Sequence, residues 1–329
     1  MDTSSERPLG SVIMPVKNIA AWIAEAIGTI DHPAGVDLEI ICVDDISDDG
    51  TVAVIEGLGD PRVRVVRNVG AGVAAGRNTG LANARGSEIY YLDGDDRFRP
   101  GAIQRLHETL AAHPEADAVV GYSSVILENG DELVAAAPPC AEGPINDYIL
   151  GGRFFHTSAF AFRRDALAEA GWARTFFRMG EDRDFMLRFT STRQIHYAPI
   201  HVSELRSRRN SVSRSTKMAL TKWYDAQADE FHAQRLATGS DALARGEAPS
   251  VPDDLPQMPN NSTFFFENKV LMGAAWLERT RGHTATSMRY LLRALREPRY
   301  WPHSPKDKLK LLVLLARDSV LGPKRGVGG

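Results

Sequence analysis

The first part of the chain alternates between short apolar runs and segments in which apolar positions recur with helical spacing. Residues 11–16 and 39–43 are nearly continuous apolar runs, the pattern of strands buried on both faces of a parallel sheet. Between them, apolar residues recur every three or four positions over residues 19–30, as on one face of a helix. The order then repeats, with predicted helices over residues 51–58 and 72–84 and predicted strands over residues 62–66 and 88–92. This order predicts a doubly wound α/β sheet.

Polar side chains follow three of the predicted strands, at the point where each strand ends. Asp44 and Asp45 follow the second strand, Asn68 follows the third, and the sequence Asp-Gly-Asp-Asp at residues 93–96 follows the fourth. Ligands of doubly wound sheets bind outside the carboxyl ends of the strands. These side chains are therefore expected to converge on one edge of the sheet, and they are the first indication of a functional site.

The rest of the chain predicts a hairpin, a long helix and a helical C-terminal region. Residues 117–127 have strand character, and the Asn-Gly turn that follows predicts a hairpin with residues 132–136. Residues 219–236 are expected to form a long helix, and prolines interrupt the chain after it. The expected organisation is a domain over residues 1–215, a helix over 216–245, a linker over 246–262 and a helical region over 263–329.

Composition and charge exclude several classes of protein. Hydrophobic residues make up 43% of the 329 positions and charged residues 25%, which is typical of a folded globular chain. The net charge of -3 excludes a general nucleic-acid binder, since such binding depends on clustered positive charge. Cys42 and Cys140 have no metal-type spacing and imply no disulfide framework. The polar N-terminus and the absence of an apolar run long enough to span a bilayer favour a cytoplasmic location.

The acidic sequence at residues 93–96 is a candidate metal site. Crowded carboxylates repel one another, so a fold retains them at a strand end together with a compensating cation. Hard oxygen ligands suit Mg²⁺ or Mn²⁺, which complete their coordination with substrate phosphate oxygens. The alternative is a solvated Asp-Gly turn, but the position directly after a predicted buried strand favours the metal site.

Asp44 and Asp45 begin a second acidic segment. Asp48 or Asp49 is expected to cap the helix that starts at Thr51. Capping does not account for Asp44 and Asp45, which come earlier, at the end of the strand. A carboxylate in that position is suited to accept a hydrogen bond from a base N–H.

A glycine-rich segment, residues 70–76, offers an alternative interpretation. It follows a strand and opens a helix, as does the dinucleotide-binding loop of dehydrogenases. Its spacing is not G-x-G-x-x-G, and it does not follow the first strand. A dehydrogenase therefore ranks below a nucleotide-sugar enzyme in which Arg77 supplies a cation near the base or the phosphates.

The order of these motifs resembles that of the family 2 inverting glycosyltransferases. The matching segments are residues 11–18 (SVIMPVKN), 43–51 (VDDISDDGT), 68–86 (NVGAGVAAGRNTGLANARG) and 91–96 (YLDGDD). The pair Glu181-Asp182 resembles the downstream motif that carries the catalytic base. The resemblance implies a GT-A fold, a single Rossmann-like nucleotide-binding mixed sheet flanked by helices, with a C-terminal helical extension. In it, residues from about 10 to 125 would bind the nucleotide sugar and residues 126–215 the acceptor.

The resemblance also implies roles for the donor-binding residues. Pro15 and Val16 would border the base, and Asp45 would bind it, with uracil as the expected base. Arg77 would lie near the base or a phosphate, and Asp93 near the ribose or the metal. The cation, Mn²⁺ or Mg²⁺, would be held by Asp95 and Asp96.

On the acceptor side, Asp182 would be the general base, with Glu181 supporting it or contacting the acceptor. His156 would line the acceptor pocket, although a lone histidine is more often structural. Trp172 would stack on a sugar, and packing in the core is an equal alternative. Closure over the diphosphate is implied for three basic residues, Arg206, Arg208 and Arg209. The family often has histidine at the position of Arg208, so its presence favours Arg–phosphate pairing over a histidine metal ligand.

The predicted function is inverting transfer of a sugar from a UDP-sugar to a hydroxyl of a glycan or lipid-linked acceptor. A nucleotidyltransferase is less favoured because the first strand is not followed by a Gly-rich loop with basic residues. A non-catalytic sugar-binding protein would be expected to lack Asp95, Asp96 or Asp182, and all three are present.

The C-terminal tail lies outside the resemblance. Residues 299–329 hold seven basic and two acidic side chains around an apolar run at residues 309–316. Such a segment suits peripheral contact with an anionic membrane at its inner face. Packing on the domain or formation of a homo-oligomer is the favoured alternative.

Overall fold

The computed structural model describes residues 9–32, 36–135, 137–138, 140–208, 218–253, 255 and 263–296. The chain divides into two compact units. The first unit comprises Met1–Ser123, Cys140–Leu205 and Ala219–Pro256. The second unit comprises Ser124–Pro139, Arg206–Met218 and Gln257–Gly329.

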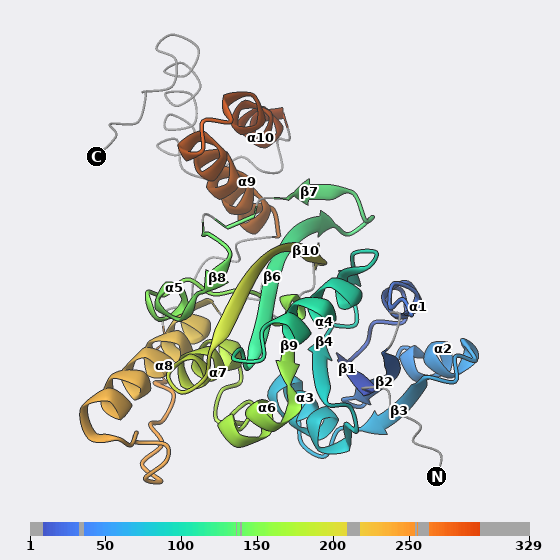
Figure 1. Cartoon of the computed structure of the whole chain (residues 1–329), viewed down its shortest axis with the longest axis vertical. Helices are drawn as coiled ribbons and strands as arrows, with labels where there is room; N and C mark the ends of the chain where they lie inside the picture. The colour runs from blue at the N-terminus through green and yellow to red at the C-terminus, as the bar shows by residue number, and fades with distance from the viewer. Residues whose placement is uncertain are drawn as a thin grey trace. The chain divides into compact units, whose positions relative to one another are not determined.

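Four parallel strands form one side of the sheet in the first unit (Figure 1). They are β1 (Leu9–Val16), β2 (Asp37–Asp44), β3 (Val63–Arg67) and β4 (Glu88–Tyr91). Their spatial order is β3-β2-β1-β4, and Val12 of β1 pairs with Ile40 on one side and Tyr90 on the other. All four predicted strands are confirmed, within two residues at each end.

Antiparallel strands complete the sheet and make it mixed. Next to β4 lies β9 (Phe160–Arg163), followed by β6 (Ala118–Leu127), β10 (Ile195–Ser207) and β5 (Arg97–Phe98). β9 is antiparallel to both β4 and β6, and β5 is antiparallel to β10. The short β8 (Gly143–Pro144) pairs with β10. The α/β fold with a mixed sheet flanked by helices is thus confirmed.

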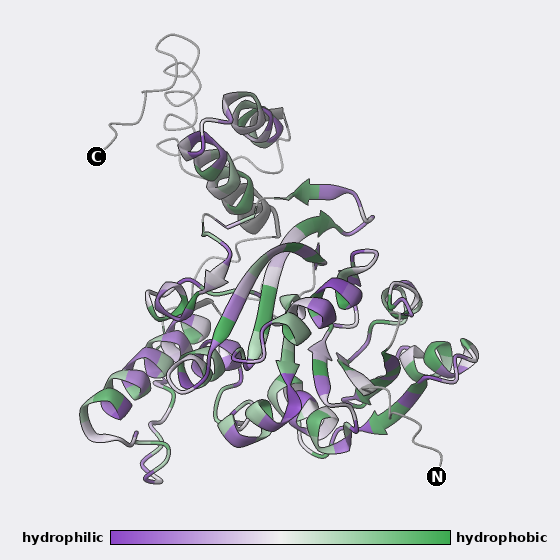
Figure 2. Cartoon of the chain, viewed as in Figure 1, coloured by the Kyte–Doolittle hydropathy of each residue, from purple (hydrophilic) through white to green (hydrophobic). Residues whose placement is uncertain are grey.

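Helices connect and flank these strands. They are α1 (Ile23–Gly28), α2 (Thr51–Gly57), α3 (Gly72–Asn83), α4 (Ala102–Ala112), α5 (Asn146–Leu150), α6 (Arg164–Ala170), α7 (Glu181–Thr190) and α8 (Met218–Thr238), with a 3-10 turn over Thr157–Ala159. α3 packs on β1 and β2, whereas α4 and α6 pack on β9. The strands are largely apolar and the helices carry mixed faces. The core therefore lies between the sheet and the helices that flank it (Figure 2).

The first helix is shorter than its apolar pattern predicts. The pattern extends over residues 19–30, but regular helix covers only Ile23–Gly28. The amide of Ile19 donates to Thr51 Oγ1 (2.9 Å) and that of Ala20 to the Asp49 carboxylate (2.9 Å). These bonds to the start of α2 hold the amides that precede α1, and the carbonyl of Ile19 accepts from the amides of Trp22 (3.0 Å) and Ile23 (3.1 Å).

The second strand contains a buried carboxylate inside its apolar run. Glu39 is buried and accepts hydrogen bonds from Ser11 Oγ (2.7 Å) and from the amide of Arg85 (2.7 Å). Burial raises the pKa of Glu39, but these bonds and the nearby arginines lower it below its ordinary value. Cys42 on the same strand is buried as expected, and burial raises the pKa of its thiol to about 12.

The second unit has a small core of its own. The end of β6 forms the predicted hairpin with β7 (Glu132–Val134), and Val125 pairs with Val134. Two helices, α9 (Thr263–Thr280) and α10 (Thr284–Arg296), pack against each other, and Leu133 joins their apolar core. The basic tail lies outside the described residues. Among the described helices, none is long and apolar enough to cross a bilayer.

A glycine in the second half of α3 allows this helix to approach β1 closely. A Cβ atom added at Gly80 would lie 2.2 Å from Ile13 Cγ2, closer than any non-bonded contact tolerates. Ile13 lies in the centre of β1 and is fully buried, so it has little room to move. Helix packing therefore requires a glycine at this position.

We expect Gly80→Ala to lower the free energy of unfolding by about 1–3 kcal/mol, the usual effect of overpacking a core. Gly57→Ala is the matched control, because Gly57 is also helical and an added Cβ there meets nothing within 4 Å. Both variants replace a helical glycine by a better helix former, so a loss seen only at Gly80 measures packing. Urea unfolding gives both values, and equal stability of the two variants would contradict close packing of α3 on β1.

Candidate active site

The ends of the parallel strands bring a carboxylate and its donors together. Asp45 follows β2, and its amide donates to the carbonyl of Val16 at the end of β1 (3.0 Å). Its carboxylate accepts hydrogen bonds from Lys17 Nζ (3.0 Å), Asn68 Nδ2 (2.9 Å) and the amide of Gly72 (3.2 Å). Lys17 follows β1, Asn68 follows β3, and Gly72 begins α3. The loops after β1, β2 and β3 therefore meet at Asp45.

These donors keep Asp45 ionised. Burial by itself raises the pKa of Asp45, but the bonds from Lys17, Gly72 and Asn68 lower it below its ordinary value. Sequence analysis did not single out Lys17, although its position directly after β1 was a usable signal. The Lys17 side chain is 60% exposed, so this cation faces solvent beside Asp45.

The two loops that flank Asp45 are held in an unusual backbone conformation. Asn18 and Ile46 have positive φ angles of 52° and 63°. The amide of Asn18 donates to Ser47 Oγ (3.1 Å), and Asn18 Oδ1 accepts from the amide of Asp48 (2.9 Å). A left-handed conformation is costly for a branched residue such as Ile46, and it persists where surrounding bonds enforce it.

A tight turn after β4 groups two of the predicted acidic residues with His156. The amide of Asp96 donates to the carbonyl of Asp93 (2.9 Å), which closes the turn. Asp93, Asp96 and His156 each offer a ligand atom, and these atoms all lie within 4.8 Å of one another. Asp95 occupies a central position of the turn and is not one of the three. Burial lowers the pKa of His156 below its ordinary value, and the charge of Asp95 is among those that oppose this effect.

Gly94 is required at the other central position of this turn. An added Cβ would lie 2.2 Å from Ile19 Cδ1 and 3.1 Å from Val16 Cγ1. The acidic turn therefore packs directly on the apolar end of β1. The sequence Asp-Gly-Asp-Asp is explained by this packing together with its carboxylates.

Arg77 connects the acidic turn to the predicted base. It is 3% exposed, and its guanidinium donates to Glu181 Oε1 (2.8 Å) and to Asp93 Oδ1 (3.0 Å). Burial lowers the pKa of Arg77, but the charges of Asp93, Glu181 and Asp182 raise it above its ordinary value. We expected this cation near the base or a phosphate, and the structure places it between two carboxylates.

Trp172 supports Arg77 from the core. Its ring stacks on Tyr91 with centroids 4.5 Å apart, contacts Phe185, and lies 6.0 Å from the Arg77 guanidinium. Trp172 is buried. The structure thus places this residue in the core, where it completes an aromatic layer under the site.

Glu181 and Asp182 begin α7, after Gly180 in a left-handed conformation. Burial and the charges of Asp182 and Asp93 raise the pKa of Glu181, although Arg77 opposes them. Asp182 accepts a hydrogen bond from the amide of Arg183 (2.8 Å). The carboxylate of Asp182 thus lies at the start of a helix, where the helix dipole favours negative charge.

An ion network fixes the orientation of α7. Asp184 is fully buried and pairs with Arg174 and with Arg188 (3.0 Å). Arg174 also pairs with buried Asp241 (2.8 Å), and Arg235 pairs with the same carboxylate of Asp241 (2.5 Å). The helix that carries Glu181 and Asp182 is thereby tied to the chain beyond α8.

The remaining predicted residues are placed as follows. Pro15 and Val16 end β1, and they pair with Val43 and Asp44 of β2. Arg206 belongs to the second unit, where it is buried and donates to the carbonyl of Glu128 (3.0 Å). Arg208 is half-buried just after β10, and Arg209 lies outside the described residues.

Comparison with known proteins identifies the class and then the family. The fold is that of GT-A glycosyltransferases such as S. aureus TarS 1-349, solved in complex with UDP-GlcNAc, at a TM-score of 0.51 and 16% identity over 85% of this chain and 87% of that one. The mannosyltransferase PcManGT from Pyrobaculum calidifontis, solved with GDP-Man and Mn²⁺, gives a TM-score of 0.52 at 18% identity over 95% and 81%. Residues 11–171 match the model of glycosyl transferase family 2. The matched segment is a family 2 glycosyltransferase domain, and it covers just under half of the chain.

Curated relatives match over shorter segments. The uncharacterized glycosyltransferase EpsJ of Bacillus subtilis (strain 168) is 38% identical over 31% of this chain and 30% of its own length. The succinoglycan biosynthesis protein ExoO of Rhizobium meliloti (strain 1021) is 38% identical over 35% and 34%. The chain thus spans about a third of the length of these two relatives.

We expect Arg77→Met to lower the free energy of unfolding by up to about 3–5 kcal/mol, because it leaves the half-buried carboxylates of Asp93 and Glu181 without their buried cation. Arg85→Met is the matched control. Arg85 also pairs with a buried carboxylate, that of Glu39, but its own side chain is 70% exposed. Glu39 keeps its hydrogen bonds from Ser11 Oγ and from the amide of residue 85 in that variant, so we expect a smaller loss. Urea unfolding of both variants checks the expectation, and similar losses would show that Arg77 is not the central ion pair.

Proposed function

We propose that this chain transfers a sugar from a nucleoside-diphosphate sugar to a hydroxyl group of a growing glycan, with a divalent metal ion and inversion at the anomeric carbon. One observation supports this function above the others. Arg77 joins Asp93 of the acidic turn to Glu181, which stands beside Asp182. A residue suited to the donor phosphates and a residue suited to the acceptor therefore share one buried cation.

The nucleotide would lie over the ends of β1, β2 and β3. Asp45 is ionised and held by three donors, so it is suited to accept an N–H of the base, with Pro15 and Val16 alongside. TarS with UDP-GlcNAc and PcManGT with GDP-Man support a nucleotide-sugar donor in this fold. We assign UDP to the donor on the resemblance of the strand-end motifs.

Asp93, Asp96 and His156 would hold the metal ion, with Asp95 beside them. Two carboxylates and one imidazole within 4.8 Å fit a divalent ion of the Mn²⁺ or Mg²⁺ class that keeps open positions for phosphate oxygens. When bound, such an ion neutralises charge on the departing diphosphate. Because Arg77 also contacts Asp93, it holds one ligand in place before the donor binds.

Asp182 would act as the general base. It takes the proton of the acceptor hydroxyl while that oxygen forms a bond to the anomeric carbon, on the face opposite the nucleoside diphosphate. The bond from the anomeric carbon to the diphosphate oxygen breaks in the same step, so the configuration inverts. Base catalysis of this kind contributes about 10²–10⁴-fold to the rate. Glu181 is held by Arg77 and would position the acceptor beside it.

The acceptor is proposed to be a polysaccharide end or its lipid-linked precursor. ExoO is named for succinoglycan biosynthesis. The chain also matches chondroitin synthase of Pasteurella multocida at 34% identity, over 30% of this chain and 10% of that protein. Both names concern polymers of sugars.

We expect Asp182→Asn to lower the rate of sugar transfer by about 10²–10⁴-fold and to leave the Kd for UDP unchanged, because the base acts only in the chemical step. Asp229→Asn is the matched control. Asp229 lies on α8, pairs with Arg183 (2.7 Å) and should retain activity. UDP release from a UDP-sugar and calorimetric titration with UDP give the two values. A large loss of UDP affinity in Asp182→Asn would remove Asp182 from the role of base.

We expect UDP to bind more tightly in Mn²⁺ than in EDTA, and Asp96→Asn to abolish this difference. GDP and NAD, titrated in the same way, should bind more weakly. Tighter binding of GDP would keep the transferase and change the donor. Metal-independent binding of NAD without binding of either diphosphate would contradict the proposed function.

A further inference from the structure

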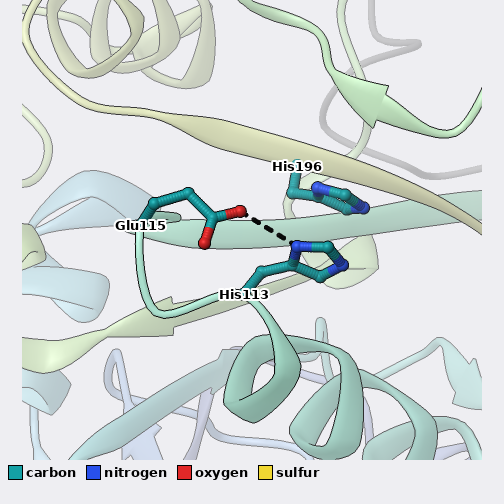
Figure 3. Close-up of side chains that lie close together, drawn as sticks. All are labelled: His113, Glu115 and His196. Atoms are coloured by element: carbon teal, nitrogen blue, oxygen red, sulfur yellow. Dashed lines mark hydrogen bonds and ion pairs between the residues drawn. The ribbon is translucent and has the colours of Figure 1, made fainter.

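A second group of potential metal ligands lies elsewhere in the first unit (Figure 3). His113 follows the last residue of α4, Glu115 lies two residues further along the same turn, and His196 is near the start of β10. Each offers a ligand atom, and these atoms all lie within 4.8 Å of one another. The group shares no residue with the acidic turn after β4.

The two imidazole rings lie one over the other, and the carboxylate of Glu115 lies beside the stack (Figure 3). The ring centroids are 3.7 Å apart, and His113 Nδ1 lies 2.9 Å from Glu115 Oε1. His196 is only 7% exposed, and its buried Nε2 has no hydrogen-bond partner in the described part of the chain. Buried polar atoms normally have a partner, so this nitrogen requires an explanation.

Backbone bonds fix the turn that carries two of the three residues. The carbonyl of His113 accepts from the amide of Ala116 (3.0 Å) and from Arg163 Nη2 (3.3 Å). Arg163 Nε also donates to the carbonyl of Ala116 (2.8 Å). The amide of Asp117 donates to the carbonyl of Gln194 (2.9 Å), and Asp117 Oδ2 accepts from the amide of Gln194 (2.8 Å). The turn is thereby attached to the segment that leads into β10 and His196.

A simple ion pair does not account for the whole group. A hydrogen bond between His113 and Glu115 explains their contact, but it leaves His196 Nε2 without a partner in the described residues. A cation bound at the edge of the stack would be shared by both rings and the carboxylate.

We propose that His113, Glu115 and His196 bind a divalent transition-metal ion of the Zn²⁺ class, which ties the end of α4 to the start of β10. Two imidazoles and one carboxylate are a common donor set for Zn²⁺, and three protein ligands leave a fourth position for water. Zn²⁺ bonds of about 2.0–2.2 Å place neighbouring ligand atoms roughly 3.3 Å apart in a tetrahedron. Binding therefore requires the ligand atoms to draw closer and the two stacked rings to tilt toward the common ion.

This site is chemically distinct from the acidic turn. Imidazole ligands favour Zn²⁺, Cu²⁺ and Ni²⁺, whereas an oxygen-rich set suits Mg²⁺ and Mn²⁺. An excess of Mg²⁺ should therefore compete at the Asp93 group and leave the histidine group free. The proposal does not depend on the proposed transferase activity, since it concerns different residues and a different metal.

The test uses the full chain without an affinity tag, stripped with EDTA and titrated calorimetrically with Zn²⁺ in excess Mg²⁺. We expect wild type to bind one equivalent at this site. His113→Gln and Glu115→Gln should each weaken that binding by at least about tenfold, the smallest loss usual even for residues that only support a ligand. His283→Gln is the matched control, because His283 contacts Glu278 (2.8 Å) as His113 contacts Glu115 but lacks a third ligand in the described residues.

Three results would overturn the proposal. The first is that wild type does not bind Zn²⁺, and the second is that His113→Gln and Glu115→Gln both keep the wild-type affinity for Zn²⁺. The third is that Asp96→Asn loses affinity for Zn²⁺ while His113→Gln does not, which would place Zn²⁺ at the acidic turn. Glu115 is exposed, so Glu115→Gln should fold normally even if His113→Gln does not. Circular dichroism of each variant confirms that a loss of affinity is not a loss of folding.

Discussion

The buried guanidinium of Arg77 is the interaction on which the candidate active site depends. It comes from α3, and it contacts Asp93 after β4 and Glu181 at the start of α7. Two half-buried carboxylates from distant parts of the chain are held close together because a buried cation lies between them. The aromatic layer around Trp172 excludes water from one side of this cation, which strengthens both ion pairs.

Close packing determines where the polar groups are held. Gly80 lets α3 approach β1, and Gly94 lets the acidic turn pack on Val16 and Ile19. Because both contacts leave no room for a Cβ atom, small shifts of α3 or of the turn are resisted. The carboxylates and Arg77 therefore meet on a rigid edge of the sheet, as the proposed binding of a charged diphosphate would require.

Much of the fold and part of the site followed from the sequence. The strands, the hairpin after residue 127 and the long helix α8 were predicted from their periodicity, because apolar spacing directly reflects which face is buried. The strand-end positions of Asp45 and Asp93 were predicted for the same reason. Lys17 was missed because a single lysine after a strand has no distinctive pattern. The burial of Glu39 was missed because its partners lie far away in sequence, at Ser11 and Arg85.

The sequence by itself determined the order of elements, the family motifs and the residue types available for chemistry, since these depend on local pattern and spacing. Only the tertiary structure decided that Arg77 pairs with carboxylates, that His156 joins Asp93 and Asp96, and that Trp172 lies in the core. It alone brought His196 against a turn some eighty residues earlier. Such pairings follow from how the sheet orders its strands, and strand order is a long-range property that no local pattern records.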